Sequence, residues 1–451
     1  MYQFRSKANH EKGYLLLEPR PVKIKLRAHA RMRPSNNRKP PTPTPYLPTS
    51  TAGTSRTTHL LELSLLHRWT TRTAATACCI PADLPVMQIQ LPRRALQYGW
   101  LLDSIFAFTL LDEGRVCAAD GTTDRCNRAA LTYYNRALRG FRREMARGGG
   151  GGGVTRENCD AVYLVSVAVA VVHMAGMGVA RAVGEEYGGG GGGGVGGRRE
   201  RLPSVLEAMP AFFELLRGTG AIAMACIGWL VESVASVAAV LALPPARLGD
   251  GDGEARSALE RLARVNDALH GGETAEGGLW GEGASALETA VKAAERAAAE
   301  RVDGEGKEED QEVELMAEAH RMYGEQVIPP LVRAYAEDAR GEVDAFWLNF
   351  PIFAGRRFKE GIERCDPMAL LVLMHWAVLV ERHGKKAWWA RDVGRRLIEE
   401  ISVVLDGSEF RLLPDFRDAM AWARLQVGLP DVLSDGLSSG FEVMEVSDDV
   451  E

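Results

Sequence analysis

The sequence has few of the residue patterns that would give it a chemical activity. It has seven cysteines, an odd number, and no two of them form a C-x-x-C pair. This pattern argues against both a zinc site and a disulfide framework. It contains neither an H-E-x-x-H nor a G-x-x-x-x-G-K-[ST] motif. We therefore predict that the protein is not an enzyme and has no catalytic or metal-binding residues. A reducing compartment, the nucleus or the cytoplasm, is the simplest location for such a chain.

Sustained alternation of apolar and polar residues is also lacking, which argues against a protein built on strands. The clearest helical pattern runs from Asp366 to Ile401. Asp366 can cap a helix, Pro367 suits its first turn, and Gly384 can close it. This helix is apolar on nearly every face and should be buried. A one-sided helix over 386–405 should cover it from outside, and the whole chain should be all-α.

Further helices are expected across one large domain of residues 59–430. They cover 59–71, 101–112, 127–145, 157–183, 205–218, 219–243, 256–269, 285–301, 312–326, 328–340, 342–348, 352–364 and 414–426. Ser204 and Glu207 form a capping box at the start of one of them. The most amphipathic, 127–145, should bury Leu131, Tyr134, Leu138, Phe141 and Met145 and expose its arginines.

Charge is unevenly distributed along the chain. Sixty acidic residues oppose 54 basic ones, a net charge of −6, yet residues 1–60 hold twelve basic residues against two acidic ones. We predict a disordered basic, Pro/Thr-rich arm over 1–58 and an acidic disordered tail over 431–451. The arm could contact phosphates or a nuclear import receptor. The basic residues concerned are Lys23, Lys25, Arg27, Arg31, Arg33, Arg38 and Lys39.

Three segments of biased composition interrupt the domain. Glycine dominates 148–153 and 188–197, and acidic residues crowd 302–314. A run of glycines matches a glycine-rich phosphate-loop pattern by composition alone, so the match does not indicate phosphate binding. We interpret the two tracts as low-complexity insertions in surface loops. The third segment is interpreted as an acidic linker.

Two apolar stretches, 161–180 and 219–243, are long enough to cross a membrane. The second carries Glu232, and a carboxylate within a membrane costs roughly 2.5–3.5 kcal/mol even on insertion scales. Alanine and glycine, which add little transfer energy, supply much of both stretches. Buried helices of a soluble bundle are the favoured interpretation, so we predict no stable membrane insertion.

Methionine and tryptophan concentrate in the apolar helices. Such residues usually form plain core, but methionine adapts to irregular shapes and would suit a flat lipid. The candidate pocket residues are Met174, Met177, Met224, Trp229, Phe346, Trp347, Met374 and Trp376. His173, His375 and Glu232 lie in the same helices and are interpreted as core polar groups with hydrogen-bond partners, although each could touch a ligand hydroxyl.

The order of these segments resembles the C-terminal regulatory region of fungal transcription factors of the binuclear zinc-cluster class, most of all the sterol uptake control proteins. The resemblance rests on HLLELSLLHRWTT (59–71), LLDSIFAFTLL (101–111), YYNRALRGFRREM (133–145), TRENCDAVYLVSVAVAV (155–171), LLRG (215–218), WLNFPIFAGRRF (347–358) and ALLVLMHWAVLV (369–380) with Trp388 and Trp389. It implies an all-helical domain whose apolar pocket senses a sterol or similar lipid and which regulates transcription by RNA polymerase II. The transcription machinery or a second copy would be its protein partners.

The family's DNA-binding module holds zinc with six cysteines near the N-terminus. The region before residue 59 contains no cysteine. We therefore expect no zinc cofactor in this chain and no sequence-specific DNA contact through that module. Two alternatives stay open: a helical protein-interaction module that has lost DNA and ligand binding, and an integral membrane protein that uses the two apolar stretches.

Overall fold

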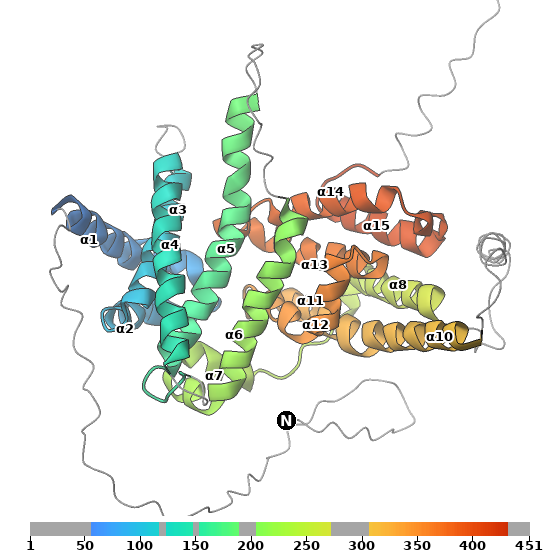
Figure 1. The fold of residues 1–451 in the computed structure, drawn as a ribbon, viewed down its shortest axis with the longest axis horizontal. Helices are drawn as coiled ribbons and strands as arrows, with labels where there is room; N and C mark the ends of the chain where they lie inside the picture. The colour runs from blue at the N-terminus through green and yellow to red at the C-terminus, as the bar shows by residue number, and fades with distance from the viewer. Residues whose placement is uncertain (1–55, 117–122, 148–152, 189–203, 272–305, 432–451) are drawn as a thin grey trace, which may run out of the picture. The chain divides into compact units, whose positions relative to one another are not determined.

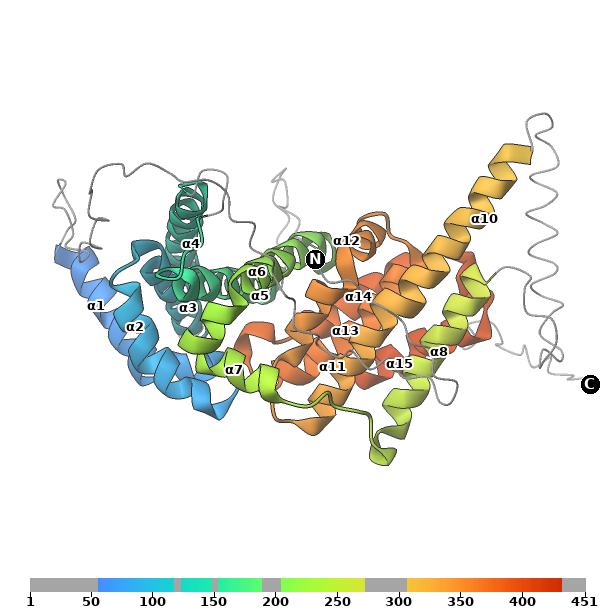
Figure 2. The ribbon, with the colours of Figure 1, turned by 90° about the horizontal axis from the view of Figure 1, so that it is seen from below.

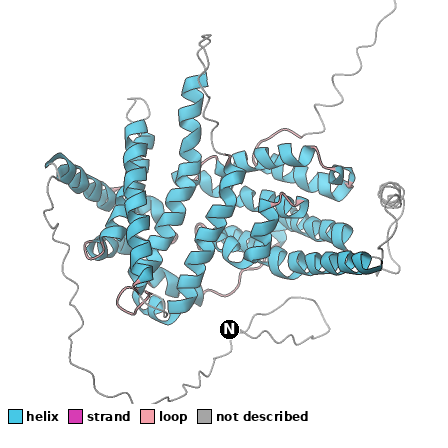
Figure 3. Ribbon diagram, in the orientation of Figure 1, coloured by secondary structure: helices cyan, strands magenta, loops and turns pink. Residues whose placement is uncertain are grey.

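The computed structural model describes residues 56–116, 123–147, 153–188, 204–271 and 306–431. The basic arm, with its seven candidate residues, and the tail after Asp431 lie outside these ranges, as does the expected helix 285–301. Every regular element in the described residues is a helix, and none is a strand (Figure 3). The prediction of an all-α fold is confirmed.

The N-terminal helices are α1 (Arg56–Thr71), α2 (Leu91–Ala95), α3 (Gly99–Val116) and α4 (Thr123–Ala146), with the short helices η1 (Thr73–Ala77), η2 (Pro81–Asp83) and η3 (Val86–Gln90) after α1. α4 packs closely on α3, because a Cβ at Gly140 would lie 2.5 Å from the Cβ of Trp100. The residues of α4 that are buried are Cys126, Ala130, Tyr133 and Ala137. Three of these four side chains are small, and the fourth, Tyr133, packs edge-on against Phe106 of α3. The expectation that Leu131 is buried was wrong, since it is 58% exposed.

Helices α5 (Cys159–Gly188) and α6 (Val205–Ser233) lie side by side, followed by α7 (Ala235–Ala242) (Figure 1). The expected break between 218 and 219 does not occur, because the helix continues to a kink at Cys226, where φ is −128° and ψ is 20°. Ser204 caps α6 as predicted, accepting a hydrogen bond from the Glu207 amide. The carboxylate beside this helix start belongs to Glu400 of α14 (Val393–Asp406) rather than to Glu207.

The next helices are η5 (Asp250–Asp252), α8 (Gly253–His270), α10 (Gly306–Arg321), η6 (Met322–Val327) and α11 (Ile328–Arg340). α8 and α10 contact each other, and Figure 2 shows them side by side. The interpretation of 302–314 as a linker was wrong from residue 306 onward, where α10 begins. Glutamate, glutamine and lysine fill this stretch, and all three are good helix formers.

The C-terminal helices are η7 (Phe346–Asn349), α12 (Phe350–Glu363), α13 (Pro367–Gly384), η8 (Trp388–Ala390), α14 (Val393–Asp406), η9 (Glu409–Leu412) and α15 (Pro414–Gln426). α13 is buried along almost its whole length, and the Asp366 carboxylate caps it by accepting from the Ala369 amide at 2.8 Å.

The expected helix 386–405 is divided by Asp392, whose φ of 61° is left-handed. α14 then approaches α13 until a Cβ at Gly394 would lie 2.3 Å from the Ala377 carbonyl oxygen.

One glycine of the first tract is not a spacer. Gly153 is buried, and a Cβ there would lie 2.2 Å from the Glu144 carbonyl oxygen at the end of α4. Its interpretation as part of a surface insertion was therefore wrong, because the chain needs close backbone contact at this point. The other residues of this tract, and those of the second tract beyond Gly188, lie outside the described residues.

Two helices are long and apolar enough to span a membrane by length and composition: Cys159–Gly178 of α5 and Val205–Ser233 of α6. In the most apolar 18-residue window of each, 56% of the first is buried within the protein but only 33% of the second. The exposed part of α6 is the half after Gly220, where Met224, Trp229 and Val231 face outward.

Candidate functional site

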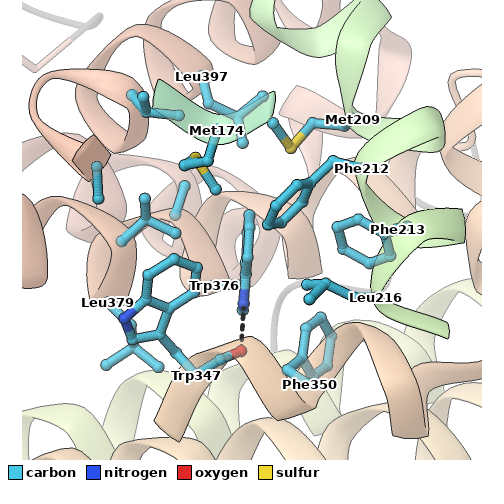
Figure 4. Packing of buried hydrophobic residues seen from close by; sticks show 14 of the residues in the cluster. Met174, Met209, Phe212, Phe213, Leu216, Trp347, Phe350, Trp376, Leu379 and Leu397 are labelled. Carbon is cyan, nitrogen blue, oxygen red and sulfur yellow. Dashed lines mark hydrogen bonds between the residues drawn. The ribbon is translucent and has the colours of Figure 1, made fainter. Parts of the chain in front are cut away.

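The largest concentration of aromatic side chains surrounds Trp376, in the middle of α13. Because α13 is apolar on all faces, its neighbours cover it from several directions, and each contributes rings or methionines. Figure 4 shows Phe212 and Phe213 of α6, Trp347 of η7 and Phe350 of α12 turned toward Trp376. We call this group the Trp376 cluster. It also includes Met174, Met209, Leu216, Phe358, Leu379 and Leu397.

The rings of the Trp376 cluster contact one another directly. The centroid of Trp376 lies 5.5 Å from those of both Phe213 and Trp347, with nearly perpendicular planes. Phe212 and Phe350 follow at 6.2 and 6.4 Å. Edge-to-face contacts at these distances are favourable beyond the burial of area. The Trp376 indole N–H also donates to the Trp347 carbonyl at 3.1 Å, which fixes the position of both residues.

Of the eight residues predicted for a pocket, five lie in the main core, and three of these five, Met174, Trp347 and Trp376, belong to the Trp376 cluster. Met174, Met177, Trp347, Met374 and Trp376 are buried in one core cluster. Phe346 is also buried, but its ring lies under the Arg333 guanidinium, 5.5 Å from its centroid. Met224 is 52% and Trp229 37% exposed on the outer half of α6. Periodicity could not separate these two from the rest because α6 is apolar on several faces.

Two buried polar atoms at the edge of the Trp376 cluster have no hydrogen-bond partner among the described residues. They are Nε1 of Trp347 and Nε2 of His383, on rings whose centroids lie 5.7 Å apart. Burial lowers the pKa of His383 to about 4, so its imidazole is neutral near pH 7. The site thus offers an indole donor and a neutral imidazole beside the apolar Trp376 cluster, with the charged Asp344 and Lys386 close enough to His383 to act on its pKa. Buried polar groups normally have partners, and a hydroxyl could serve both.

His375 is a core residue and His173 is half-buried, and each has a ring nitrogen without a hydrogen-bond partner among the described residues. His375 is fully buried, with Nδ1 2.8 Å from the Leu371 carbonyl oxygen and its ring stacked on Trp422 at 5.0 Å. His173 stacks on Phe212 at 6.5 Å. Nε2 of each is buried without a partner in the described residues. Burial lowers the pKa of both, to about 4 for His375.

The interpretation of Glu232 as a core polar group was wrong. Its side chain is 61% exposed and forms an ion pair with Arg156 at 2.7 Å. Glu232 lies after the kink at Cys226, on the exposed half of α6 that also carries Met224 and Trp229. Glu232 therefore has no role in the Trp376 cluster.

Sequence reasoning missed several members of the Trp376 cluster. Phe212 and Phe213 follow Pro210 in the run PAFFELL, and Phe350 and Phe358 lie in FPIFAGRRF. Adjacent phenylalanines in a capped apolar helix were an available signal. Phe212 and Phe213 precede Trp376 by 164 and 163 positions, and no local pattern reports that segments so far apart converge on α13.

The described residues contain no group of three or more His, Cys, Asp or Glu side chains able to hold a metal ion. The G-x-S-x-G pattern of a nucleophile elbow occurs once by residue type, at 436–440 (GLSSG), and the sequence analysis did not identify it. This segment lies outside the described residues, so no triad geometry can be assigned to it.

The comparisons with known proteins add no assignment. No family model, no curated protein and no solved structure matches the chain.

Proposed function

We propose that the helical domain is the ligand-sensing regulatory part of a fungal zinc-cluster-type transcription regulator, acting on transcription by RNA polymerase II. Its ligand would be a sterol or a similar lipid. The observation that carries this proposal is the unpaired indole N–H of Trp347 beside the unpaired imidazole nitrogen of His383, at the edge of the Trp376 cluster. The sequence resemblance to sterol uptake control proteins supports the same ligand class.

A sterol has the chemistry that these residues would recognise: a flat apolar body with a single hydroxyl. The hydroxyl could accept from Trp347 and exchange a hydrogen bond with His383. Burying ~400 Å² of sterol surface yields roughly 10 kcal/mol. Association costs at least about 4 kcal/mol, which leaves enough for micromolar binding without a charged contact.

The packing of the cluster supports sensing rather than simple storage. Its rings contact one another at centroid distances of 5.5 to 6.4 Å, so a sterol would have to displace some of them. The displaced side chains belong to α6, η7, α12 and α13. Ligand binding would therefore be coupled to a rearrangement of these elements, which is the property that a regulatory domain requires.

Equilibrium dialysis of the full chain against cholesterol or ergosterol, read by mass spectrometry, tests the proposal. We expect Trp347→Phe to weaken binding about fivefold, because one hydrogen bond is worth about 1 kcal/mol. Trp229→Phe is the matched control, since Trp229 lies on the surface of α6, and it should bind like the wild type. Absence of sterol binding by the wild type, or equal losses in both variants, would contradict the proposal.

A helical protein-interaction module is the second candidate, and the exposed apolar side of α6 and α7 favours it. Met224, Trp229, Val231 and Leu241 are each between 37% and 59% exposed. A second copy of the chain could cover them, and analytical ultracentrifugation would then detect a dimer that Met224→Glu dissociates.

The same exposed apolar residues would contact lipid if the chain were a membrane protein. Recovery of the protein only in detergent would favour that alternative.

A further inference from the structure

Helix α4 carries an unusual amount of positive charge on its outer face. The helix contains six arginines and two acidic residues, whereas the whole chain has a net charge of −6. Five of the arginines lie on one side of α4, opposite the buried Ala130, Tyr133 and Ala137 that pack on α3. All five are exposed: Arg125, Arg128, Arg139, Arg142 and Arg143. We call them the arginine face.

Ion pairing does not neutralise the arginine face. The sixth arginine of the helix, Arg136, turns toward α3 and α1 and pairs with Asp103 at 3.0 Å and Glu62 at 3.9 Å. Of the two acids of α4, Glu144 pairs with Arg147 beyond the helix end. None of the five outer arginines forms an ion pair with another described residue. The charge of this face is therefore available to a partner.

We propose that the arginine face of α4 binds the phosphate backbone of double-stranded nucleic acid without reading its sequence. Arg125 and Arg143 lie 18 residues apart, about 27 Å along a helix. Duplex DNA carries one negative charge per about 1.7 Å of its axis, so many phosphates lie within this length. The guanidinium group is planar and pairs with phosphate through two parallel hydrogen bonds, which makes arginine better suited to this contact than lysine.

The composition of the arginine face argues against an anionic membrane, a protein or single-stranded nucleic acid as its partner. Leu131 is the only large apolar side chain that is exposed on α4. Insertion into an anionic membrane needs an apolar face of several residues, and protein interfaces depend on buried aromatic or apolar anchors. Single-stranded nucleic acid is bound through stacked aromatic rings, and no exposed ring accompanies these arginines. A duplex requires only charge at regular spacing.

The test is fluorescence anisotropy of a labelled 20-base-pair duplex with the full chain, at several salt concentrations. The triple variant Arg139→Gln, Arg142→Gln, Arg143→Gln should lose at least tenfold in affinity near 0.1 M salt. Its slope of log K against log salt should fall by about 2 to 3, as expected for three lost phosphate contacts. The matched control replaces Arg364, Arg391 and Arg395, which are exposed on other elements, with glutamine. It removes the same charge and should bind like the wild type.

The basic arm of residues 1–55 is present in every variant, so the difference between the two triple variants isolates α4. A third variant with lysine at positions 139, 142 and 143 should retain most of the salt slope, which separates charge from folding. Equal binding by both glutamine variants, or no duplex binding by the wild type at 50 mM salt, would overturn the proposal. Binding to phosphatidylserine vesicles but not to the duplex would overturn it in favour of a membrane.

Discussion

The Glu400 carboxylate and the Ser204 hydroxyl lie 2.6 Å apart, although 196 residues separate them in the sequence. The same carboxylate accepts from the amides of Val205 and Leu206 at 3.1 and 2.9 Å. A glutamate of α14 therefore satisfies the first free N–H groups of α6 and places a negative charge at the positive end of its dipole. One turn earlier, Arg396 donates to the Met177 carbonyl of α5 at 2.7 Å. Through these two residues, α14 holds both long apolar helices.

Glu400→Gln should lower the free energy of unfolding by about 1–2 kcal/mol, because charged hydrogen bonds and the dipole interaction are lost. Urea denaturation followed by circular dichroism measures this as a lower midpoint at an unchanged slope. Glu399→Gln is the control, since Glu399 is the exposed neighbour on the same helix. Equal midpoints for the two variants would show that the capping contact contributes nothing.

Stability should fall on acidification from pH 6.5 to pH 4, partly because of His375. Burial lowers its pKa in the folded protein from 6.5 to about 4. Between these values the unfolded chain binds a proton that the folded protein does not, so unfolding is favoured as the pH falls. The stabilisation is complete above pH 6.5, and about 3 kcal/mol of it is lost by pH 4. Thermal unfolding across this range, compared with His375→Asn, measures the effect; parallel curves would contradict it.

Two helical glycines should respond oppositely to alanine. Gly140→Ala should destabilise the protein by about 1–3 kcal/mol, because its Cβ would meet Trp100 at 2.5 Å. Gly218→Ala in α6 has no neighbouring atom within 4 Å of the new Cβ. It should stabilise the protein by up to about 1 kcal/mol through helix propensity. Differential scanning calorimetry gives both melting temperatures, and a shift of the same sign in both would refute the packing described for α3 and α4.

Trp376 and Trp229, which the sequence placed in the same predicted pocket, should contribute very differently to the free energy of unfolding. Trp376→Phe removes an indole that is fully buried and donates to Trp347, so we expect a loss of about 2–4 kcal/mol. Trp229→Phe replaces a surface ring and should change the unfolding free energy by less than about 0.5 kcal/mol. Guanidinium denaturation of both variants provides the comparison. A larger loss of unfolding free energy in Trp229→Phe than in Trp376→Phe would contradict the packing described for the Trp376 cluster.

Local signals predicted most of the helices, and long-range packing accounts for what they missed. α11 and α15 begin and end where residues 328–340 and 414–426 were expected, and the cap at Asp366 was also foreseen. These features depend on proline, capping and periodicity within a few residues. By contrast, residues 218–231 of α6 include no charged residue, so the sequence could not show that Met224 and Trp229 face outward. The role of Glu400 was likewise invisible, because its partner lies in a distant segment.

The candidate site was predicted to a similar extent. Trp347, Met374 and Trp376 were identified by residue type, and all three lie in the core. The unpaired nitrogens of Trp347 and His383 could not be foreseen. Whether a buried nitrogen has a hydrogen-bond partner can be decided only when the positions of all neighbouring side chains are known.

The absence of a side chain at Gly394 has a mechanical consequence. There the backbones of α13 and α14 touch, and a Cβ would lie 2.3 Å from the Ala377 oxygen. Two main chains in direct contact have no rotamer to change and little freedom to slide past each other. A displacement of α13 caused by a guest among its rings would therefore move α14 as well. Glu400 would then shift relative to the first turn of α6, which would relay the event from α13 to the start of α6.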